Sequence, residues 1–326
     1  MLAVVAVIGC EKKPLEAEGR NNGGFDVLRD TEQPTFDAES DTRSATDTAD
    51  VDDGAEGDVP SPDGDAASGP LVRVAVGVDH SCVLGSDRRV DCWGRDDDGE
   101  VSLPSGKLQA ITAGDGFTCG IRMDDEVDCW GRDDFGQVSL PTGKLEEIAA
   151  GKSHLCGLRA DGSAECWGKD DRGQASPSKG TYRDIAAGKA FSCGILEDGS
   201  LSCWGRDDDG EASPPKGTYV QVSAGDLHAC AIAEDGEVVC WGDDEFGQQS
   251  LPSGTLSVVA AGWGHTCGLR ASGQIDCWGR DDFGQTSLPT GKHVGVAAGE
   301  GHTCAVDGNG EVDCWGEDEY GEASPP

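Results

Sequence analysis

The sequence predicts an all-β protein, a seven-bladed β-propeller of 37-residue repeats preceded by a disordered acidic tether. Three observations predict this fold. Pairs of cysteines ten positions apart recur seven times, and each pair lies 37 residues after the last. Fifty glycines indicate short elements joined by tight turns. Every repeat also contains short β-like segments bounded by Gly, Pro, Asp or Ser. A constant period of this length is typical of repeat architectures.

Each repeat is predicted to contain four strands, described here for the sixth repeat. They span residues 257–262, 265–269, 274–279 and 285–289. Seven such units favour a propeller over an open solenoid, because closing the ring hides the edges of the sheets. We expect ring closure to pair the N-terminal strand near Val72–Val76 with the last blade.

The second and third strands form a hairpin whose register can be predicted. In the fifth repeat, Glu234-Asp235-Gly236 fits a type I turn followed by a left-handed glycine, a position that Arg88 and Asp125 occupy in the first two repeats. Pairing outward from this turn places Cys230 opposite Cys240 at a non-hydrogen-bonded pair, where strands approach most closely.

A disulfide fits that geometry, and the alternative is that the cysteines are reduced core residues. The predicted bonds join Cys82 to Cys92, Cys119 to Cys129, Cys156 to Cys166, Cys193 to Cys203, Cys230 to Cys240, Cys267 to Cys277, and Cys304 to Cys314.

Two further repeat positions are predicted to be structural. The tryptophan after each second cysteine points to the opposite face of the blade and should pack between blades. A second position holds His in five repeats and Phe117 or Phe191 in the other two. A position that accepts Phe is not catalytic, so we expect these histidines to hydrogen-bond within their own blade. His293 lies outside the pattern and has no nucleophile nearby to activate.

Charge and composition restrict the classes of function. The chain has 326 residues and a net charge of −37, which argues against binding nucleic acid and favours a basic partner or cations. No stretch approaches the roughly 20 apolar residues of a spanning helix. No phosphate-binding loop, nucleophile elbow or zinc-ligand spacing is present, so we expect no cofactor and no metal site.

The N-terminal segment is expected to direct export. Residues 1–10 end in Val7-Ile8-Gly9-Cys10, which resembles a bacterial lipobox, although no Lys or Arg precedes the apolar run. If Cys10 is lipidated, the lipid would be the protein's attachment to the membrane. The predicted disulfides agree with export, because disulfides persist outside the reducing cytosol. Residues 11–70 are acidic and aperiodic and should form a disordered linker, and residues 71–326 should form the propeller.

The repeat resembles that of the regulator of chromosome condensation family. Its unit reads Ala-Ala-Gly-x-x-His-Thr-Cys-Gly-Leu, then Val-Asp-Cys-Trp-Gly-x-Asp-x-x-Gly-Gln, and it covers residues 71–326. The cysteines and the acids after Trp-Gly depart from the family's usual residues. The resemblance implies a seven-bladed propeller that binds proteins on one face, with secreted β-lactamase-inhibitory propellers as the most similar members. Nucleotide exchange is not implied, because this chain is acidic and is expected to be exported.

Candidate binding residues are those at which the repeats differ. The loops between strands one and two should share a face with the loops after strand three. On this face Trp263 stands where the other repeats have smaller or charged residues. The predicted binding residues are Trp263, Phe246, Phe283, Tyr320, Asp226 and Leu227. Pairs of acids after each Trp-Gly should form a solvated rim around them.

These observations predict a monomeric, non-enzymatic lipoprotein in the bacterial envelope. Its acidic, aromatic-bearing face would bind a protein partner, for which charge favours a basic one, or an envelope glycan. Two alternatives stay open. A propeller lyase or glycosidase would need polar residues clustered at one channel mouth, and few are present. A structural, cation-binding cell-surface protein would use the acidic rim.

Overall fold

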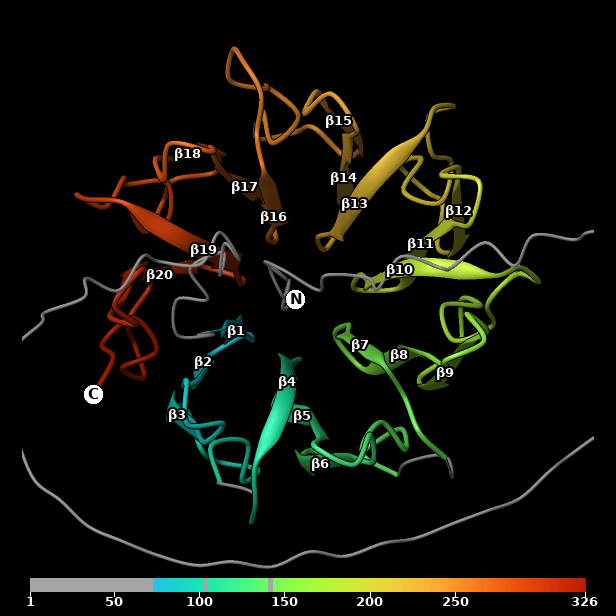
Figure 1. The fold of residues 1–326 in the computed structure, drawn as a ribbon. Coiled ribbons are helices and arrows are strands. Elements are labelled where there is room, and N and C mark those ends of the chain that lie inside the picture. The colour runs from blue at the N-terminus through green and yellow to red at the C-terminus, as the bar shows by residue number, and fades with distance from the viewer. Residues whose placement is uncertain (1–72, 103–104, 140–142) are drawn as a thin grey trace, which may run out of the picture. The chain divides into compact units, whose positions relative to one another are not determined.

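The computed structural model describes residues 73–102, 105–139 and 143–326. The predictions for residues 1–10 and 11–70, including lipidation at Cys10, lie outside this part of the chain. The described residues contain strands and turns but no helix, and therefore no helix that could cross a membrane. They form seven antiparallel sheets, one for each repeat, arranged in a ring (Figure 1). The predicted seven-bladed all-β propeller is confirmed.

Each sheet contains three strands in chain order. The first strands lie nearest the centre of the ring (Figure 1) and are β1 (Arg73–Val76), β4 (Leu108–Ala113), β7 (Glu147–Ala150), β10 (Tyr182–Ala187), β13 (Tyr219–Ala224), β16 (Val258–Ala261) and β19 (His293–Ala298). The second strands are β2 (His80–Leu84), β5 (Phe117–Arg122), β8 (His154–Leu158), β11 (Phe191–Leu196), β14 (His228–Ala233), β17 (His265–Leu269) and β20 (His302–Asp307). The third strands are β3 (Val90–Gly94), β6 (Val127–Gly131), β9 (Ala164–Gly168), β12 (Leu201–Gly205), β15 (Val238–Gly242), β18 (Ile275–Gly279) and β21 (Val312–Gly316).

The predicted fourth strand does not form. In the sixth repeat, residues 285–289 are turn and coil. Their backbone donors are used locally, because Thr286 N donates to Asp281 Oδ1 at 2.9 Å and Ser287 N donates to Gly284 O at 3.0 Å. The proline that follows, Pro289, has no N–H to donate. The segment therefore folds back as a turn instead of pairing with β18.

The hairpin register and the disulfides agree with the sequence prediction. Cys230 pairs with Cys240 and Ile232 with Val238, and the two cysteine Cα atoms lie 4.0 Å apart. All seven repeats contain the corresponding disulfide. Gly236 has a φ of +81°, as the turn requires, and Arg88 and Asp125 adopt φ values of 69° and 68° at the same position.

The core lies between neighbouring sheets. Phe191 and Ile195 of β11 are fully buried and pack with Val222 of β13 and Ala229 of β14 in the next repeat. A three-stranded sheet cannot bury both of its faces by itself, so each blade depends on its neighbours.

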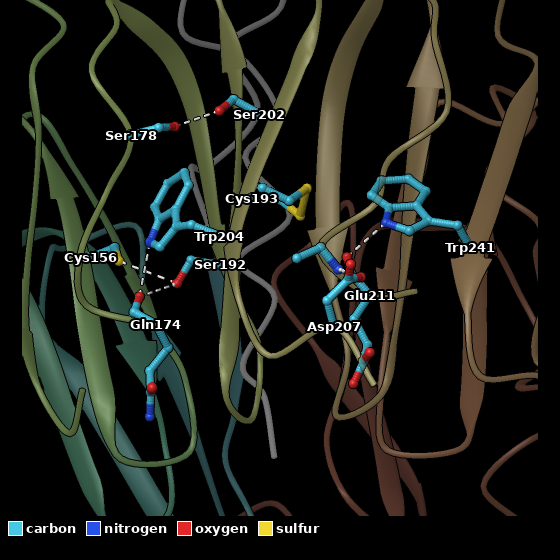
Figure 2. Close-up of a disulfide and its surroundings, with 12 residues drawn as sticks. Cys156, Gln174, Ser178, Ser192, Cys193, Ser202, Trp204, Asp207, Glu211 and Trp241 are labelled. Carbon is cyan, nitrogen blue, oxygen red and sulfur yellow. Dashed lines mark hydrogen bonds between the residues drawn. A yellow bond between two sulfur atoms is a disulfide. The ribbon is translucent and has the colours of Figure 1, made fainter. Parts of the chain in front are cut away.

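A hydrogen-bonded junction links each repeat to the next (Figure 2). Trp204 Nε1 and Ser192 Oγ both donate to the carbonyl oxygen of Gln174 in the preceding repeat, at 2.9 and 3.0 Å. Trp241 Nε1 donates in the same way to Glu211 O at 2.9 Å (Figure 2). The expected position of the tryptophans between blades is confirmed.

Ring closure uses this same junction. Trp93 Nε1 and Ser81 Oγ of the first repeat donate to Glu322 O of the last, at 2.9 and 3.0 Å. The expectation that the first strand pairs with the last blade is wrong, because β1 pairs with β2 of its own sheet. Among the residues that the structure describes, each repeat supplies all three strands of its own sheet. The ring is closed by these bonds from side chains to a backbone carbonyl and by the packing of Val76 against Ala297 of the last repeat.

Candidate functional site

The loops between first and second strands share a face with the loops after third strands, as expected. Arg280, the residue after β18, donates its N–H to Gly264 O in the loop between β16 and β17 at 2.8 Å. Gly279 makes this turn possible, because it has a φ of +100° and an added Cβ would lie 2.5 Å from Gly264 O. The hairpin turns lie on the opposite face, where Gly236 O accepts a hydrogen bond from Leu256 N of the next repeat at 3.1 Å.

A buried amide fixes the loop that carries Phe283. Gln285 is fully buried, and its Oε1 accepts a hydrogen bond from Phe283 N at 2.9 Å. Gln248 holds Phe246 N in the same way, also at 2.9 Å. Their backbones are thus anchored while both rings remain on the surface, 41% exposed for Phe246 and 45% for Phe283. The aromatic side chains are therefore presented by preorganised loops.

Three aromatic rings surround one arginine. The guanidinium carbon of Arg280 lies 3.9 Å from the ring centre of Trp263, 5.4 Å from that of Phe246 and 5.6 Å from that of Phe283. The rings of Phe246 and Trp263 are 6.1 Å apart. We call these four residues the Arg280 cluster. Cation–π attraction to each ring favours this arrangement.

Gly264 provides the space in which the cluster forms. A Cβ added there would lie 3.1 Å from Phe246 Cδ2 and 3.4 Å from Arg280 Cβ. Arg280 Nε also donates to Asp282 Oδ2, which fixes the orientation of the guanidinium group. The side chain of Arg280 is only 16% exposed, so the rings contact a mostly buried guanidinium group. The solvent-facing surface of the cluster is mainly aromatic.

The structure separates the remaining predicted site residues from this cluster. Tyr320 is exposed, but its ring packs against Arg95 of the first repeat, with the guanidinium carbon 5.3 Å from the ring centre. Asp226 is buried, and its Oδ2 lies 3.1 Å from Lys189 Nζ. Leu227, the next residue, is half-buried. Of the six candidates, only Trp263, Phe246 and Phe283 come together.

The acidic rim is exposed, but its carboxylates are not simply solvated. The first acid of each pair caps its own turn, as Asp207 does when its Oδ1 accepts from Ala212 N at 2.9 Å and its Oδ2 from Ser213 Oγ at 2.8 Å. All seven repeats contain this backbone bond. The aspartate is thus a turn-forming residue, because its side chain accepts the turn's free N–H.

The second acid of each pair depends on the residue after Trp-Gly. Where that residue is Arg or Lys, it pairs with the second acid, as Arg95 Nε does with Asp97 Oδ2 at 2.6 Å. The fifth and seventh repeats have Asp243 and Glu317 instead. Their exposed second acids, Glu245 and Glu319, have no ion-pair partner within the described ranges. Burial and the nearby Glu322, Asp79 and Glu319 carboxylates raise the pKa of Glu317.

The repeated histidines are buried, but their hydrogen bonds cross to the next blade. His154 Nε2 lies 2.8 Å from Ser192 Oγ, and the expectation of bonds within one blade is wrong. Burial lowers the histidine pKa to about 4 for His80 and His228 and to about 3 for His154, His265 and His302. His293 is separate from this set, and its Nε2 lies 3.0 Å from Asp313 Oδ2. Within the ranges that the structure describes, no three His, Cys, Asp or Glu side chains are grouped to hold a metal.

Sequence reasoning missed Arg280. Its position is basic in five repeats and acidic in the fifth and seventh, and comparing it with the aromatic position three residues later would have revealed the pattern. Where one repeat has an aromatic residue there, the next repeat can place a cation on the ring, as Lys169 does 5.1 Å from the ring centre of Phe135. Phe135 belongs to the second repeat, and no second large aromatic residue joins it in the described residues.

Comparison with known proteins identifies the repeat. A family model described as Regulator of chromosome condensation (RCC1) repeat matches residues 71–100, 109–137, 146–174, 182–211, 219–248, 257–285 and 294–322. These stretches make up more than half of the chain. No curated protein matches the chain.

Solved structures with a similar fold include two plant receptor-kinase ectodomains. The CRINKLY WD40 ectodomain of Arabidopsis thaliana ACR4 is 30% identical with a TM-score of 0.64, covering 78% of this chain and 94% of that one. The entire ectodomain of Physcomitrella patens CR4 is 28% identical with a TM-score of 0.64, covering 74% and 73%. Human WBSCR16, 16% identical with a TM-score of 0.60 and coverages of 72% and 86%, shares the fold alone.

Proposed function

This chain belongs to the regulator of chromosome condensation (RCC1) repeat family, and from that premise we propose that it is a non-enzymatic, exported lipoprotein whose propeller binds a protein partner. The binding surface is the face that carries the Arg280 cluster. One observation carries this proposal: Phe246 and Phe283 are anchored by buried amides yet exposed, beside Trp263, on one side of the ring. Protein interfaces are enriched in such aromatic anchors and in Arg.

Rigid presentation supports binding over a packing role. An aromatic ring that only stabilised the fold would be covered by the neighbouring blade, as Trp204 is at 7% exposure. Phe283 and Phe246 instead leave more than a third of their surface in solvent. Because their loops are already ordered, little conformational entropy would be lost on association.

Export is supported by the cysteines and by the similar structures. Seven disulfides would be stable outside the reducing cytosol. Two of the similar solved structures are ectodomains of receptor kinases. The lipobox-like Val7-Ile8-Gly9-Cys10 would supply the anchor. These three observations support the proposal of an envelope location with a lipid as the membrane attachment.

The histidines support a non-catalytic role. The five repeated side chains are buried, and each holds a Ser or Thr hydroxyl of the next blade. A general acid or base must reach the substrate and have a pKa near the working pH. These imidazoles meet neither condition, since their pKa values are lowered to about 3 or 4.

Site-specific photo-cross-linking tests this function. A benzoylphenylalanine at position 283 samples the proposed face, and one at Met123, which is 54% exposed in the hairpin turn after β5, samples the opposite face. We expect discrete protein adducts from position 283 and none from position 123 when envelope fractions are irradiated. The same adducts from both positions, or none from position 283, would contradict binding through this face.

A further inference from the structure

Uncompensated negative charge on the proposed face is concentrated beside the Arg280 cluster. The loop after β15 holds Asp243, Asp244 and Glu245 with no Lys or Arg before Phe246. The loop after β21 holds Glu317, Asp318 and Glu319 and is equally free of bases. These two loops belong to the fifth and seventh repeats, on either side of the sixth repeat that supplies Trp263, Arg280 and Phe283.

The other repeats neutralise the same positions internally. Arg206 Nε lies 2.8 Å from Asp208 Oδ2, and Lys169 Nζ lies 3.4 Å from Asp171 Oδ2. Arg280 does the same for Asp282. Only in the fifth and seventh repeats do exposed second acids, Glu245 and Glu319, lack such a partner among the residues that the structure describes. Every repeat has the acid pair, but in the part of the chain that the structure describes the fifth and seventh differ from the others in leaving its second acid unpaired.

The two unpaired carboxylates belong to loops that adjoin the Arg280 cluster. Glu245 directly precedes Phe246, a member of the cluster. Glu319 lies in the loop after β21, where Glu317 N donates to Gly301 O at 2.9 Å, and Trp263 N donates to Gly299 O of the same β19–β20 loop at 3.2 Å. An exposed aromatic surface is thus flanked by two loops whose second acids have no ion-pair partner in the described part of the chain.

We propose that the Arg280 cluster, together with Glu245 and Glu319, binds a partner segment in which an apolar or aromatic residue is flanked by Lys or Arg on both sides. This inference rests on the proposed function and names the chemistry of its partner. The apolar residue would pack on Phe246 and Phe283, and its basic neighbours would reach the two unpaired carboxylates. Charge complementarity of this kind steers association and fixes the register of the bound segment.

The binding of a synthetic peptide to the whole protein tests this inference. The probe is a fluorescein-labelled Lys-Lys-Trp-Lys-Lys peptide, compared with Glu-Glu-Trp-Glu-Glu and with Lys-Lys-Ser-Lys-Lys by fluorescence anisotropy. The ionic strength is held near 0.15 M, where distant surface charges are largely screened. We expect the first peptide to bind at least about 5-fold more tightly than either comparison peptide, because only it satisfies both rings and carboxylates.

Charge-matched variants separate a local site from general attraction to an acidic protein. Glu245→Gln/Glu319→Gln removes the two unpaired acids. Asp97→Asn/Asp208→Asn removes two acids that are paired with Arg95 and Arg206 on the same face. We expect the first pair of changes to weaken peptide binding about 5-fold or more and the second less than about 2-fold, because Asp97 and Asp208 are already paired with arginines. Both variants change the net charge by the same amount, so a difference between them reports a local site. Equal weakening by both variants would overturn the inference.

Two further outcomes distinguish this inference from the proposed function. If position 283 cross-links to a protein but the Lys-Lys-Trp-Lys-Lys peptide does not bind, the face binds proteins and the basic-segment inference is wrong. If an oligomer of N-acetylglucosamine binds at the cluster and the glutamine variants do not affect it, the occupant is a glycan and the inference is also overturned. If position 283 yields no adduct, the proposed function itself fails.

Discussion

His265 Nε2 lies 2.9 Å from Thr303 Oγ1, so a buried hydrogen bond crosses from the sixth repeat to the seventh. Thr303 Oγ1 also donates to Gln285 O at 3.0 Å. The hydroxyl proton is used in that bond, so the imidazole must be the donor and carries its proton on Nε2. Four other boundaries have the same His-to-hydroxyl contact, one of which joins His302 to Ser81 at 2.8 Å and closes the ring.

The two boundaries without this contact have a matched alternative. Phe117 replaces His in the second repeat and packs in one buried cluster with Leu155 of the third. Phe191 replaces it in the fourth and packs in one buried cluster with Ala229 of the fifth. At all seven boundaries, the residue at the His position therefore matches its neighbour in the next repeat. A histidine faces a hydroxyl side chain, and a phenylalanine faces an apolar one. Buried polar groups need partners, so the two positions must change together.

The first prediction concerns this pairing. Thr303→Ala leaves the His265 Nε2–H buried without an acceptor and should lower the free energy of unfolding by about 1–3 kcal/mol. Adding His265→Phe recreates the Phe191–Ala229 pair and should recover about 1 kcal/mol or more of that loss. Guanidinium denaturation of the wild type, both single variants and the double variant measures the coupling. Strictly additive effects would contradict the proposed dependence of one position on the other.

The second prediction concerns acid sensitivity. The folded-state pKa of His265 is lowered to about 3, below its ordinary value of 6.5, because burial disfavours the charged form. The stability that this neutral imidazole contributes is present above pH 6.5 and is lost as pH falls toward 3. Between pH 7 and pH 5 the loss should be about 2 kcal/mol for each such histidine.

His265→Phe/Thr303→Ala isolates this effect from the carboxylates, which are common to both proteins. Unfolding free energies measured at pH 7 and pH 5 should fall about 2 kcal/mol less in this variant than in the wild type. An identical fall in the two proteins would show that His265 is not neutral in the folded state.

The third prediction concerns the disulfides. Replacing Cys230 and Cys240 by Ala opens an 11-residue loop and should cost about 2–3 kcal/mol in the chain-entropy model. Thermal unfolding of the variant in oxidising buffer measures this cost. Mass spectrometry of the unreduced wild type should find no free thiol at the fourteen repeat positions. Alkylated thiols at these positions would contradict the pairing and remove the main structural support for export.

The fourth prediction concerns the hairpin turns that lack glycine. Arg88 has a φ of 69°, which costs about 1–2 kcal/mol for a residue with a Cβ. Arg88→Gly should therefore raise the free energy of unfolding by about 1 kcal/mol. Asp125→Gly should gain less, because the Asp125 carboxylate accepts from Gln109 Nε2 at 2.9 Å and pairs with Lys144 Nζ at 3.3 Å. A larger gain at Asp125 than at Arg88 would show that these side-chain contacts contribute nothing.

The period of the sequence was sufficient to predict the propeller and the hairpin register. Cys230 faces Cys240 because a tight turn fixes pairing over the few residues that follow it. The absence of a fourth strand could not be predicted, because Gln285–Pro289 is as short and as β-like as the true strands. Whether this segment pairs as a strand depends on Asp281, because its carboxylate accepts the Thr286 N–H that strand pairing would need.

Contacts between repeats were predicted less well than contacts within them. The His265–Thr303 bond joins residues 38 apart, so assigning the histidines to their own blade overlooked the next repeat. The sequence did contain evidence for this contact, because the residues 38 positions after Phe117 and Phe191 are the apolar Leu155 and Ala229. In the candidate site, the exposure of the aromatic residues could be predicted from their positions in loops. The position of Arg280 over three rings could not, because it depends on packing that no local pattern shows.

The affinity of the partner recovered by cross-linking, measured for Phe283→Ala and Phe135→Ala, tests the central claim most directly. The two rings are similarly exposed, at 45% and 47%, and lie on the same face, but only Phe283 belongs to the Arg280 cluster. An aromatic anchor at the centre of an interface contributes about 2 kcal/mol or more, so Phe283→Ala should weaken binding at least about 10-fold. Phe135→Ala should leave affinity within about 2-fold of the wild type. Equal losses in the two variants, or no loss for Phe283→Ala, would contradict binding through the Arg280 cluster.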